Sequence, residues 1–275
     1  LRSPLSFALE VNGKLSGIIF SGIPSGHEFN SFILALLQCG GSDLKLDSSI
    51  LELISNIKED LNFEVFISLS CQNCPEVVQT LNKFAIVNKN ISNEMIDGAF
   101  FQDIIDERNI QGVPSIYLNG DPFLNGRVDI AKILEKLQHL YPNLEKVKTE
   151  SLPLQDVTVI GGGPAGISAA IYSARKGLDV VLVAETMGGQ VKDTMGIENL
   201  TSVSNTTGAE LTRDMYNHLN DYDVTLREHL RVLEVTKGDI KIVKLSSGEK
   251  IRSKVIIVAT GANWRELNIP GEREN

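Results

Sequence analysis

Two cysteines, Cys71 and Cys74, are separated by two residues and could exchange electrons with a disulfide. A β-rich run, 63–69, leads directly into them, and an apolar pattern with helical spacing, 77–85, follows. The start of a helix favours a thiolate through the helix dipole and the unpaired backbone N–H groups. We therefore expect Cys71 to be the attacking thiolate and Cys74, one helical turn later, to be the resolving cysteine.

A zinc site and a pair of inert buried cysteines are the two alternatives for this pair. Zinc needs two more ligands, but the sequence has no second Cys-x-x-Cys, and its four histidines form no paired spacing. We therefore predict no metal site. A strand-to-helix junction is the setting that favours redox use of the motif. The third cysteine, Cys39, follows an apolar stretch, 32–37, and is interpreted as a core packing residue.

Pro114 lies in the segment Gly112-Val113-Pro114, immediately before a strand-like run. Proline cannot donate a hydrogen bond to the ladder of a central strand, so either an edge position or a cis peptide bond beside the cysteines would explain it. The order of elements, the Cys-x-x-Cys pair and this later Val-Pro resemble the thioredoxin fold. That resemblance implies that the Val113-Pro114 bond is cis and that Pro114 packs against the cysteine pair.

A glycine-rich segment, 161–166, follows a predicted strand at 156–160 and opens a predicted helix at 167–175. A second predicted strand, 179–184, ends at Glu185. A lone glycine motif would also fit an ordinary turn without a ligand, but this order of elements is that of a dinucleotide-binding βαβ unit. The sequence therefore predicts a Rossmann-like site here.

The three glycines of this motif have separate tasks. Gly161 allows a tight turn, Gly163 lets the backbone approach a pyrophosphate at the helix N-terminus, and Gly166 permits close packing of the helix. Glu185 can hold a ribose hydroxyl. The cofactor-binding residues predicted from the motif are Gly161, Gly163, Pro164, Ala165, Gly166 and Glu185.

Composition narrows the class of protein. The net charge of −9 gives no basic surface for nucleic acid or for an anionic membrane. The longest uncharged stretch, 157–174, is interrupted by Gly161-Gly162-Gly163-Pro164, which predicts a strand and a helix rather than a membrane span. Three cysteines without a signal-peptide core indicate a cytoplasmic protein. Because the chain opens on Leu1 without an initiator Met, we expect it to begin inside a longer gene product.

The length of 275 residues suits two domains. The predicted order from residue 63 to 140 is strand, helix, strand, helix, strand, strand, helix, with a hairpin turn at Asn119-Gly120-Asp121. Two strands and two helices are predicted before it, at 5–20, 27–38 and 48–58. Beyond the nucleotide motif we expect a helix and two or three strands that end near Gly261. The fold class is α/β, a thioredoxin-like module followed by the first half of a Rossmann-like FAD-binding domain.

Several further segments resemble the low-molecular-weight thioredoxin reductases and their relatives. Gly188-Gly189-Gln190, Ile197-Glu198-Asn199 and Val258-Ala259-Thr260-Gly261-Ala262 look like the segments that contact the flavin in that family. The segments 26–29, 70–75, 171–177 and 259–265 are most similar to its peroxiredoxin-reducing branch, the flavoprotein subunits of alkyl hydroperoxide reductases. The resemblance implies FAD as cofactor and adds Gly188, Gly189, Gln190, Asn199, Ala259, Thr260 and Gly261 to the cofactor-binding residues.

The family resemblance also implies a domain plan and a route for electrons. Residues 1–57 would be part of a first thioredoxin-like fold, 58–141 the second, 142–155 a linker and 156–275 the FAD-binding domain. NADH or NADPH would reduce the flavin, and Cys71 and Cys74 would reduce the peroxiredoxin subunit that removes alkyl hydroperoxides. The full-length protein would be a homodimer.

Glu28 has two interpretations. By the resemblance it is an acid near the redox pair that takes a proton from Cys74, and by position it is an acidic residue favoured by the dipole at a helix start. Two alternatives also remain for the chain: a thioredoxin reductase fused to a thioredoxin-like domain for general disulfides, and a binding module without turnover. Because no second dinucleotide motif and no second Cys-x-x-Cys is present, we expect the chain alone to pass electrons once chemically reduced but not to oxidise NADH or NADPH.

Overall fold

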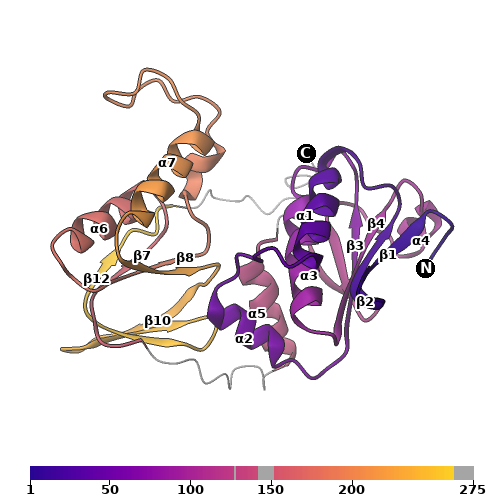
Figure 1. Ribbon diagram of the computed structural model, residues 1–275, viewed down its shortest axis with the longest axis horizontal. Coiled ribbons are helices and arrows are strands. Elements are labelled where there is room, and N and C mark those ends of the chain that lie inside the picture. The colour runs from indigo at the N-terminus through magenta and orange to yellow at the C-terminus, as the bar shows by residue number, and fades with distance from the viewer. Residues whose placement is uncertain (127, 142–151, 263–275) are drawn as a thin grey trace. The chain divides into compact units, whose positions relative to one another are not determined.

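The computed structural model describes residues 1–126, 128–141 and 152–262, which form two compact units (Figure 1). The first unit extends to residue 141, and the second begins at residue 152. Most of the predicted linker, 142–151, lies outside the described residues, as does the last part of the 259–265 segment. The two units are therefore described separately.

The first unit is a six-stranded sheet with helices on both faces. Its elements are β1 (Ser6–Val11), β2 (Lys14–Ser21), the 3-10 helix η1 (Gly26–Glu28), α1 (Phe29–Cys39), α2 (Ser48–Ser55), β3 (Leu61–Ile67), α3 (Cys74–Val87), β4 (Ile91–Asp97), α4 (Gln102–Glu107), β5 (Ser115–Leu118), β6 (Asp121–Asn125) and α5 (Ile130–Leu140). Every predicted element of this half is present, with ends that differ by a few residues. The strand order is β1-β2-β4-β3-β5-β6.

Strands β2, β4 and β3 run parallel to one another, whereas the outer pairs are antiparallel. Ser21 pairs with Ile96, and Ile67 pairs with Asp97, so the three parallel strands end at one edge of the sheet. Strands from both sides of the predicted domain border at 57/58 belong to this one sheet. The assignment of 1–57 to a separate fold stays a prediction.

Both hairpins of this unit turn through an Asn-Gly pair. Asn119 and Gly120 join β5 to β6 with φ angles of 53° and 90°, as Asn12 and Gly13 join β1 to β2 with 52° and 74°. Positive φ at both central residues is the requirement of a type I′ turn, which Asn-Gly meets at low cost. The hairpin predicted at 119–121 is confirmed.

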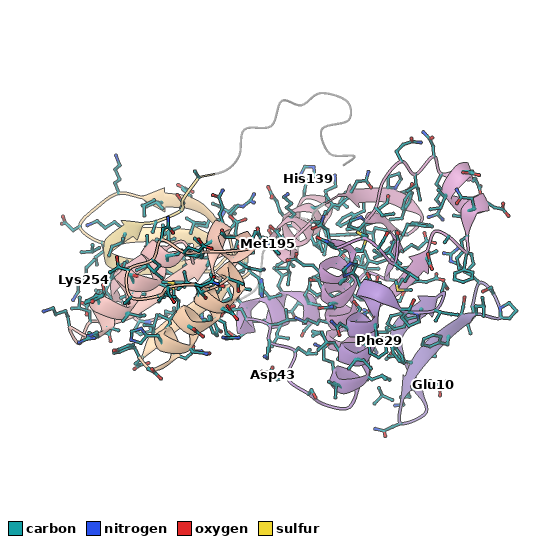
Figure 2. The ribbon with its side chains drawn as sticks, turned by 90° about the horizontal axis from the view of Figure 1, so that it is seen from above. Glu10, Phe29, Asp43, His139, Met195 and Lys254 are labelled. Carbon is teal, nitrogen blue, oxygen red and sulfur yellow. A yellow bond between two sulfur atoms is a disulfide. The ribbon has the colours of Figure 1, made fainter. Side chains whose placement is uncertain are left out.

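Helices α1 and α3 lie on one face of the sheet (Figure 1), and α4 packs on the other against Phe66, Ile96 and Tyr117. The contact of α1 with α3 uses small and polar residues such as Ser31, whose hydroxyl accepts a bond from Gln79 at 3.1 Å. The apolar residues of α1 are therefore largely exposed, beginning with Phe29 (Figure 2). Cys39, at the end of α1, is half-buried rather than in the core.

The second unit is also a six-stranded sheet. Its elements are β7 (Gln155–Ile160), α6 (Pro164–Ala174), β8 (Val180–Ala184), the 3-10 helix η3 (Gly189–Asp193), α7 (Gly208–Asn220), β9 (Val224–Glu228), β10 (Val232–Thr236), β11 (Lys241–Leu245) and β12 (Lys250–Val258). The strand order is β10-β11-β12-β7-β8-β9. Strands β12, β7, β8 and β9 are parallel, and β10 and β11 form an antiparallel extension.

Two features of this unit differ from the sequence prediction. Four strands follow α7 instead of two or three, because β9 and β10 carry no fully buried position and so show little alternation of apolar and polar residues. Helix α6 begins at Pro164 rather than at Ile167, since a proline fits the first turn of a helix. The predicted strand, glycine loop, helix and strand are all present in the expected order.

The aromatic cluster around Phe20 should anchor the first two strands to the thioredoxin-like unit. Phe20 is fully buried, stacks on Phe7 at 5.4 Å and meets Phe32 edge-on at 5.6 Å. We expect Phe20→Ala to lower the free energy of unfolding of the first unit by about 3–5 kcal/mol. Leu15→Ala, at an exposed position of the same strand, should change it by less than about 0.5 kcal/mol. Urea denaturation would measure both changes in free energy, and equal effects of the two substitutions would contradict the anchoring role of the Phe20 cluster.

Candidate redox and nucleotide-binding sites

The two cysteines are joined as a disulfide at the start of α3. Cys74 is the first residue of the helix and is fully buried, whereas Cys71 lies in the loop before it and is half-buried. The backbone N–H of Cys74 points to the Cys71 sulfur at 3.1 Å. A helix-start N–H directed at this sulfur would stabilise a thiolate once the pair is reduced.

The Val113-Pro114 peptide bond is cis, as predicted. The carbonyl oxygen of Val113 lies 3.8 Å from the Cys71 sulfur, so this segment borders the cysteine pair. Strand β5, which follows at Ser115, is paired on both sides, with β3 and with β6. The alternative explanation of Pro114, a simple edge strand, is therefore wrong.

Glu28 closes η1, and its side chain is fully buried. The N–H of His27 donates to the carbonyl of Leu69 at 3.1 Å, which holds η1 against the loop that leads to Cys71. Neither carboxylate oxygen of Glu28 has a hydrogen-bond partner among the described residues. Burial raises the pKa of Glu28 to about 7, and the nearby Ser31 hydroxyl, which does not form a well-shaped hydrogen bond with the carboxylate, offsets only part of that rise. A carboxyl group in this state exchanges a proton near neutral pH.

Glu28 does not cap the helix that it precedes. It is the N-cap residue of α1, but its side chain makes no capping hydrogen bond. Both the dipole interpretation and the proton-acceptor interpretation of Glu28 stay predictions.

In the second unit, the expected nucleotide-binding segments come from the carboxyl ends of three neighbouring parallel strands. Gly161 follows β7, Glu185 follows β8 and Ala259 follows β12. The N–H of Ala259 donates to the carbonyl of Ile160 at 2.8 Å, which ties the end of β12 to the start of the glycine loop. Open α/β sheets bind ligands at this kind of edge.

The glycines of the loop are required for two different reasons. A side chain on Gly161 or on Gly166 would collide with backbone, because its Cβ would lie 2.2 Å from the Ala259 oxygen or 1.8 Å from the Gly161 oxygen. A Cβ on Gly163 would meet no atom within 4 Å. Gly163 is the N-cap of α6 and so lies at the positive end of that helix, which favours an anionic group such as a pyrophosphate. Pro164 and Ala165 form the first turn of that helix.

The structure brings most of the other predicted flavin segments to the same loop. The N–H of Gly188 donates to the Gly162 carbonyl at 2.8 Å, and Gly189 closely approaches Gly163. The Gln190 side chain donates to the Ala262 carbonyl, just past Thr260 and Gly261. Asn199 is exposed in the irregular segment between η3 and α7, and its role stays a prediction.

Arg231 is a residue of this site that the sequence did not indicate. Its Nη2 atom lies 2.8 Å from Oε2 of Glu185, the predicted ribose acid. No motif marks this arginine, and only the folding of the segment after β9 brings it beside the end of β8. Nearby, Tyr216 donates to Glu228 at 2.7 Å, and burial together with that carboxylate raises the pKa of Tyr216 to about 12.

Within the described residues, no group of three or more His, Cys, Asp or Glu side chains is arranged to hold a metal ion. In the same part of the chain, no helix combines the length and the apolar character needed to cross a bilayer.

Comparison with known proteins agrees with the two units. Residues 155–275 match the family model for pyridine nucleotide-disulphide oxidoreductases, and residues 61–139 match the model for a thioredoxin domain. The chain is 46% identical to the F subunit of alkyl hydroperoxide reductase from Staphylococcus aureus over 274 residues, and 46% identical to that from Pseudomonas aeruginosa over 277 residues. Each match covers 99% of this chain and 53% of the relative. The chain thus spans about half the length of the curated relatives it matches.

Two solved structures are similar to parts of the chain. The F subunit of alkylhydroperoxide reductase from Enterococcus faecalis is 33% identical over 50% of this chain and 66% of its own, with a TM-score of 0.47. Thioredoxin reductase of Lactococcus lactis is 37% identical over 42% of this chain and 39% of its own, with a TM-score of 0.41.

A thioredoxin-like unit with a redox-active cysteine pair, joined to a Rossmann-like unit, defines a chain of the pyridine nucleotide-disulphide oxidoreductase class. Sequence identity along nearly the whole chain then narrows that class. Along 99% of its own length, the chain is similar to about half of the F subunits of alkyl hydroperoxide reductases.

The raised pKa of Glu28 has a consequence for stability. The folded chain binds the Glu28 proton more tightly than the unfolded chain, so this group favours folding below its ordinary pKa of 4.5, and that contribution is lost as the pH rises through about 7. Glu28→Gln should remove this loss of stability at rising pH. The difference in free energy of unfolding between Glu28→Gln and the unsubstituted chain should therefore change by on the order of 3 kcal/mol across this pH range. Urea denaturation at several pH values would measure it.

Glu76→Gln is the matched control, because Glu76 is exposed in the first turn of α3. Its stability should follow the unsubstituted chain throughout. Stability curves for Glu28→Gln that run parallel to those of the unsubstituted chain would contradict the buried, protonated state of Glu28.

Proposed function

We propose that this chain acts within a flavin-dependent disulfide reductase, in which the second unit binds FAD and the cysteine pair of the first unit reduces the disulfide of a peroxiredoxin. The observation that supports this most strongly is the asymmetry of the pair. Cys71 is partly exposed and receives the N–H of Cys74, whereas Cys74 is fully buried. Such a pair has one cysteine for attack and one for release.

The proposed exchange has two steps. In the reduced chain, the Cys71 thiolate attacks one sulfur of the partner's disulfide, forms a mixed disulfide and releases the partner's other sulfur as a thiolate. The Cys74 thiol then loses its proton and attacks the Cys71 sulfur. The Cys71–Cys74 disulfide forms again, and the partner leaves with both of its cysteines reduced.

Glu28 is the proposed acceptor of the Cys74 proton. Its carboxyl group is buried, lacks a hydrogen-bond partner among the described residues and has a pKa raised to about 7, so at neutral pH both of its protonation states are populated. A base with this pKa matches the pH at which the exchange must run. The bond from His27 to Leu69 keeps η1 beside the cysteine loop.

FAD fits the second unit because the Gly163 side of the loop is open at the start of α6, while Glu185 stands at the next strand end. Bound there, FAD would accept a hydride from NADH or NADPH and supply electrons to a dithiol. The chain's own residues would hold the pyrophosphate at Gly161–Gly166 and the ribose at Glu185. The segments 188–190 and 259–261 would surround the rest of the flavin nucleotide.

The relatives carry the name alkyl hydroperoxide reductase, which motivates a peroxiredoxin as the partner and the removal of alkyl hydroperoxides as the role. We propose a cytoplasmic site of action, where a cysteine pair is kept reducible, and a homodimer for the full-length protein. A peroxiredoxin disulfide and an unrelated protein disulfide, offered side by side to the reduced chain, would separate this role from that of a general thioredoxin reductase.

The roles of the two cysteines can be trapped. Cys74→Ser should accumulate a covalent adduct with the peroxiredoxin, because Cys71 attacks and nothing resolves the mixed disulfide. Cys71→Ser should yield no adduct. Non-reducing electrophoresis with mass spectrometry would measure both. An adduct that forms only with Cys71→Ser would reverse the assignment.

The glycine loop offers a matched pair of substitutions. Gly163→Ala should leave the thermal midpoint of the second unit unchanged, since its Cβ meets no protein atom. It should weaken FAD binding about tenfold, because the methyl group occupies the approach of the pyrophosphate. Gly166→Ala should instead destabilise the fold by about 1–3 kcal/mol through overpacking. Flavin fluorescence and calorimetry would distinguish the two effects, and a Gly163→Ala variant with normal FAD affinity would contradict the site.

A further inference from the structure

The acid at the end of β8 is paired with a base from another part of the chain. Arg231 Nη2 lies 2.8 Å from Glu185 Oε2, and each side chain is 37% exposed. We propose that Arg231 is a positioning residue, which orients Glu185 toward the ribose hydroxyls of the adenosine half of a flavin nucleotide. This inference rests on the proposed function, because it takes the second unit as the FAD site.

The backbone of Arg231 is held on two sides. On one side, the preceding residue, Leu230, is buried and donates its N–H to the Ala184 carbonyl at 3.3 Å, at the end of β8. On the other side, Arg231 donates its N–H to the Ser246 hydroxyl at 3.0 Å and accepts a bond from the Ser246 N–H at 2.8 Å. The arginine side chain therefore starts from a fixed point beside Glu185, which lowers the entropy lost in holding the pair.

The neighbouring charges at this edge are engaged with other groups. Glu228, at the end of β9, accepts the bond from Tyr216 at 2.7 Å. Arg227 binds both carboxylate oxygens of the buried Glu249, at 2.8 and 3.1 Å. Directly after β8, the ion pair is formed by Arg231 and Glu185.

This pairing suits a ribose in geometry and in charge. The bond from Arg231 is made to Oε2 of Glu185, so Oε1 is the oxygen that would accept from a ribose hydroxyl. Arg231 also neutralises a carboxylate that would otherwise repel the anionic pyrophosphate expected at the start of α6. Replacing Arg231 should therefore weaken the binding of the ribose hydroxyls by Glu185 and leave the structure of the glycine loop unchanged.

Two probes separate this role from a structural one: ADP, which carries the adenosine and pyrophosphate of FAD, and 2′,3′-dideoxy-ADP, which lacks the ribose hydroxyls. The unsubstituted chain should prefer ADP. In Arg231→Met we expect the affinity for ADP and for FAD to fall about tenfold, and the preference for ADP over the dideoxy probe to be largely lost. Calorimetric titration would give the affinities, and thermal unfolding without ligand should be unchanged.

Further variants test whether Arg231 acts through Glu185. Arg231→Met combined with Glu185→Gln should bind ADP no more weakly than Glu185→Gln alone, because the two residues act as a unit. Arg231→Lys should recover part of the loss. Arg213→Met is the control, since Arg213 is exposed and forms an ion pair with its neighbour Asp214, and it should bind ADP normally.

The outcomes are separable. An Arg231→Met variant that keeps the preference for ADP over 2′,3′-dideoxy-ADP would overturn the positioning role, as would additive losses in the double variant. An unsubstituted chain that binds neither ADP nor FAD would overturn the proposed cofactor site and this inference with it. Normal binding by the unsubstituted chain with an unaffected Arg231→Met variant would refute this inference alone.

Discussion

Parallel strands of a sheet end at one edge, and this constraint places the reactive groups of both units. In the first unit, β2, β3 and β4 end together, so the loops that carry Glu28 and Cys71 leave from the same side. In the second unit, β7, β8 and β12 end together beneath the glycine loop. Residues far apart in the sequence become neighbours there, and bonds such as that from His27 to Leu69 then fix their loops against one another. The chemical behaviour of each side chain at these edges then depends on whether its loop is polar, buried or exposed to solvent.

Burial decides how the two carboxylates singled out in the sequence behave. Glu28 has no hydrogen-bond partner among the described residues and lies in the interior, so its neutral form is favoured. Glu185 is partly exposed and has an arginine beside it. The same residue type is thereby suited to accepting a proton in one unit and a hydroxyl hydrogen bond in the other. The difference comes from the surroundings that the fold supplies and not from the residue.

Local patterns in the sequence were sufficient for most elements and for both motifs. The Asn-Gly turn and the strand-to-helix position of the cysteine pair each depend on a few adjacent residues and are present as predicted, but the helix begins at Cys74 and not at Cys71. The cis bond before Pro114 followed from the resemblance to the thioredoxin fold, because the residues alone left an edge strand open. Strands β9 and β10 were difficult to count because neither has a fully buried position. The apolar stretch of α1 suggested a core face, but the helix packs through Ser31 and its neighbours. The partnership of Arg231 with Glu185 depends on a long-range arrangement that no short pattern encodes.

The parallel pairing of β2 with β4 also limits how the chain could be divided. A fragment that began at residue 58 would retain Cys71, Cys74 and Pro114, yet it would lose Glu28 along with the strand that covers one side of β4. The bared edge of β4 would offer a row of unpaired N–H and C=O groups, which is a template for association between molecules. The segment that carries the cysteine pair is therefore not structurally independent of the residues before it. The strand that pairs with β4 and the proposed proton acceptor both come from residues that precede the pair, so recombination or limited proteolysis near residue 57 would remove both at once.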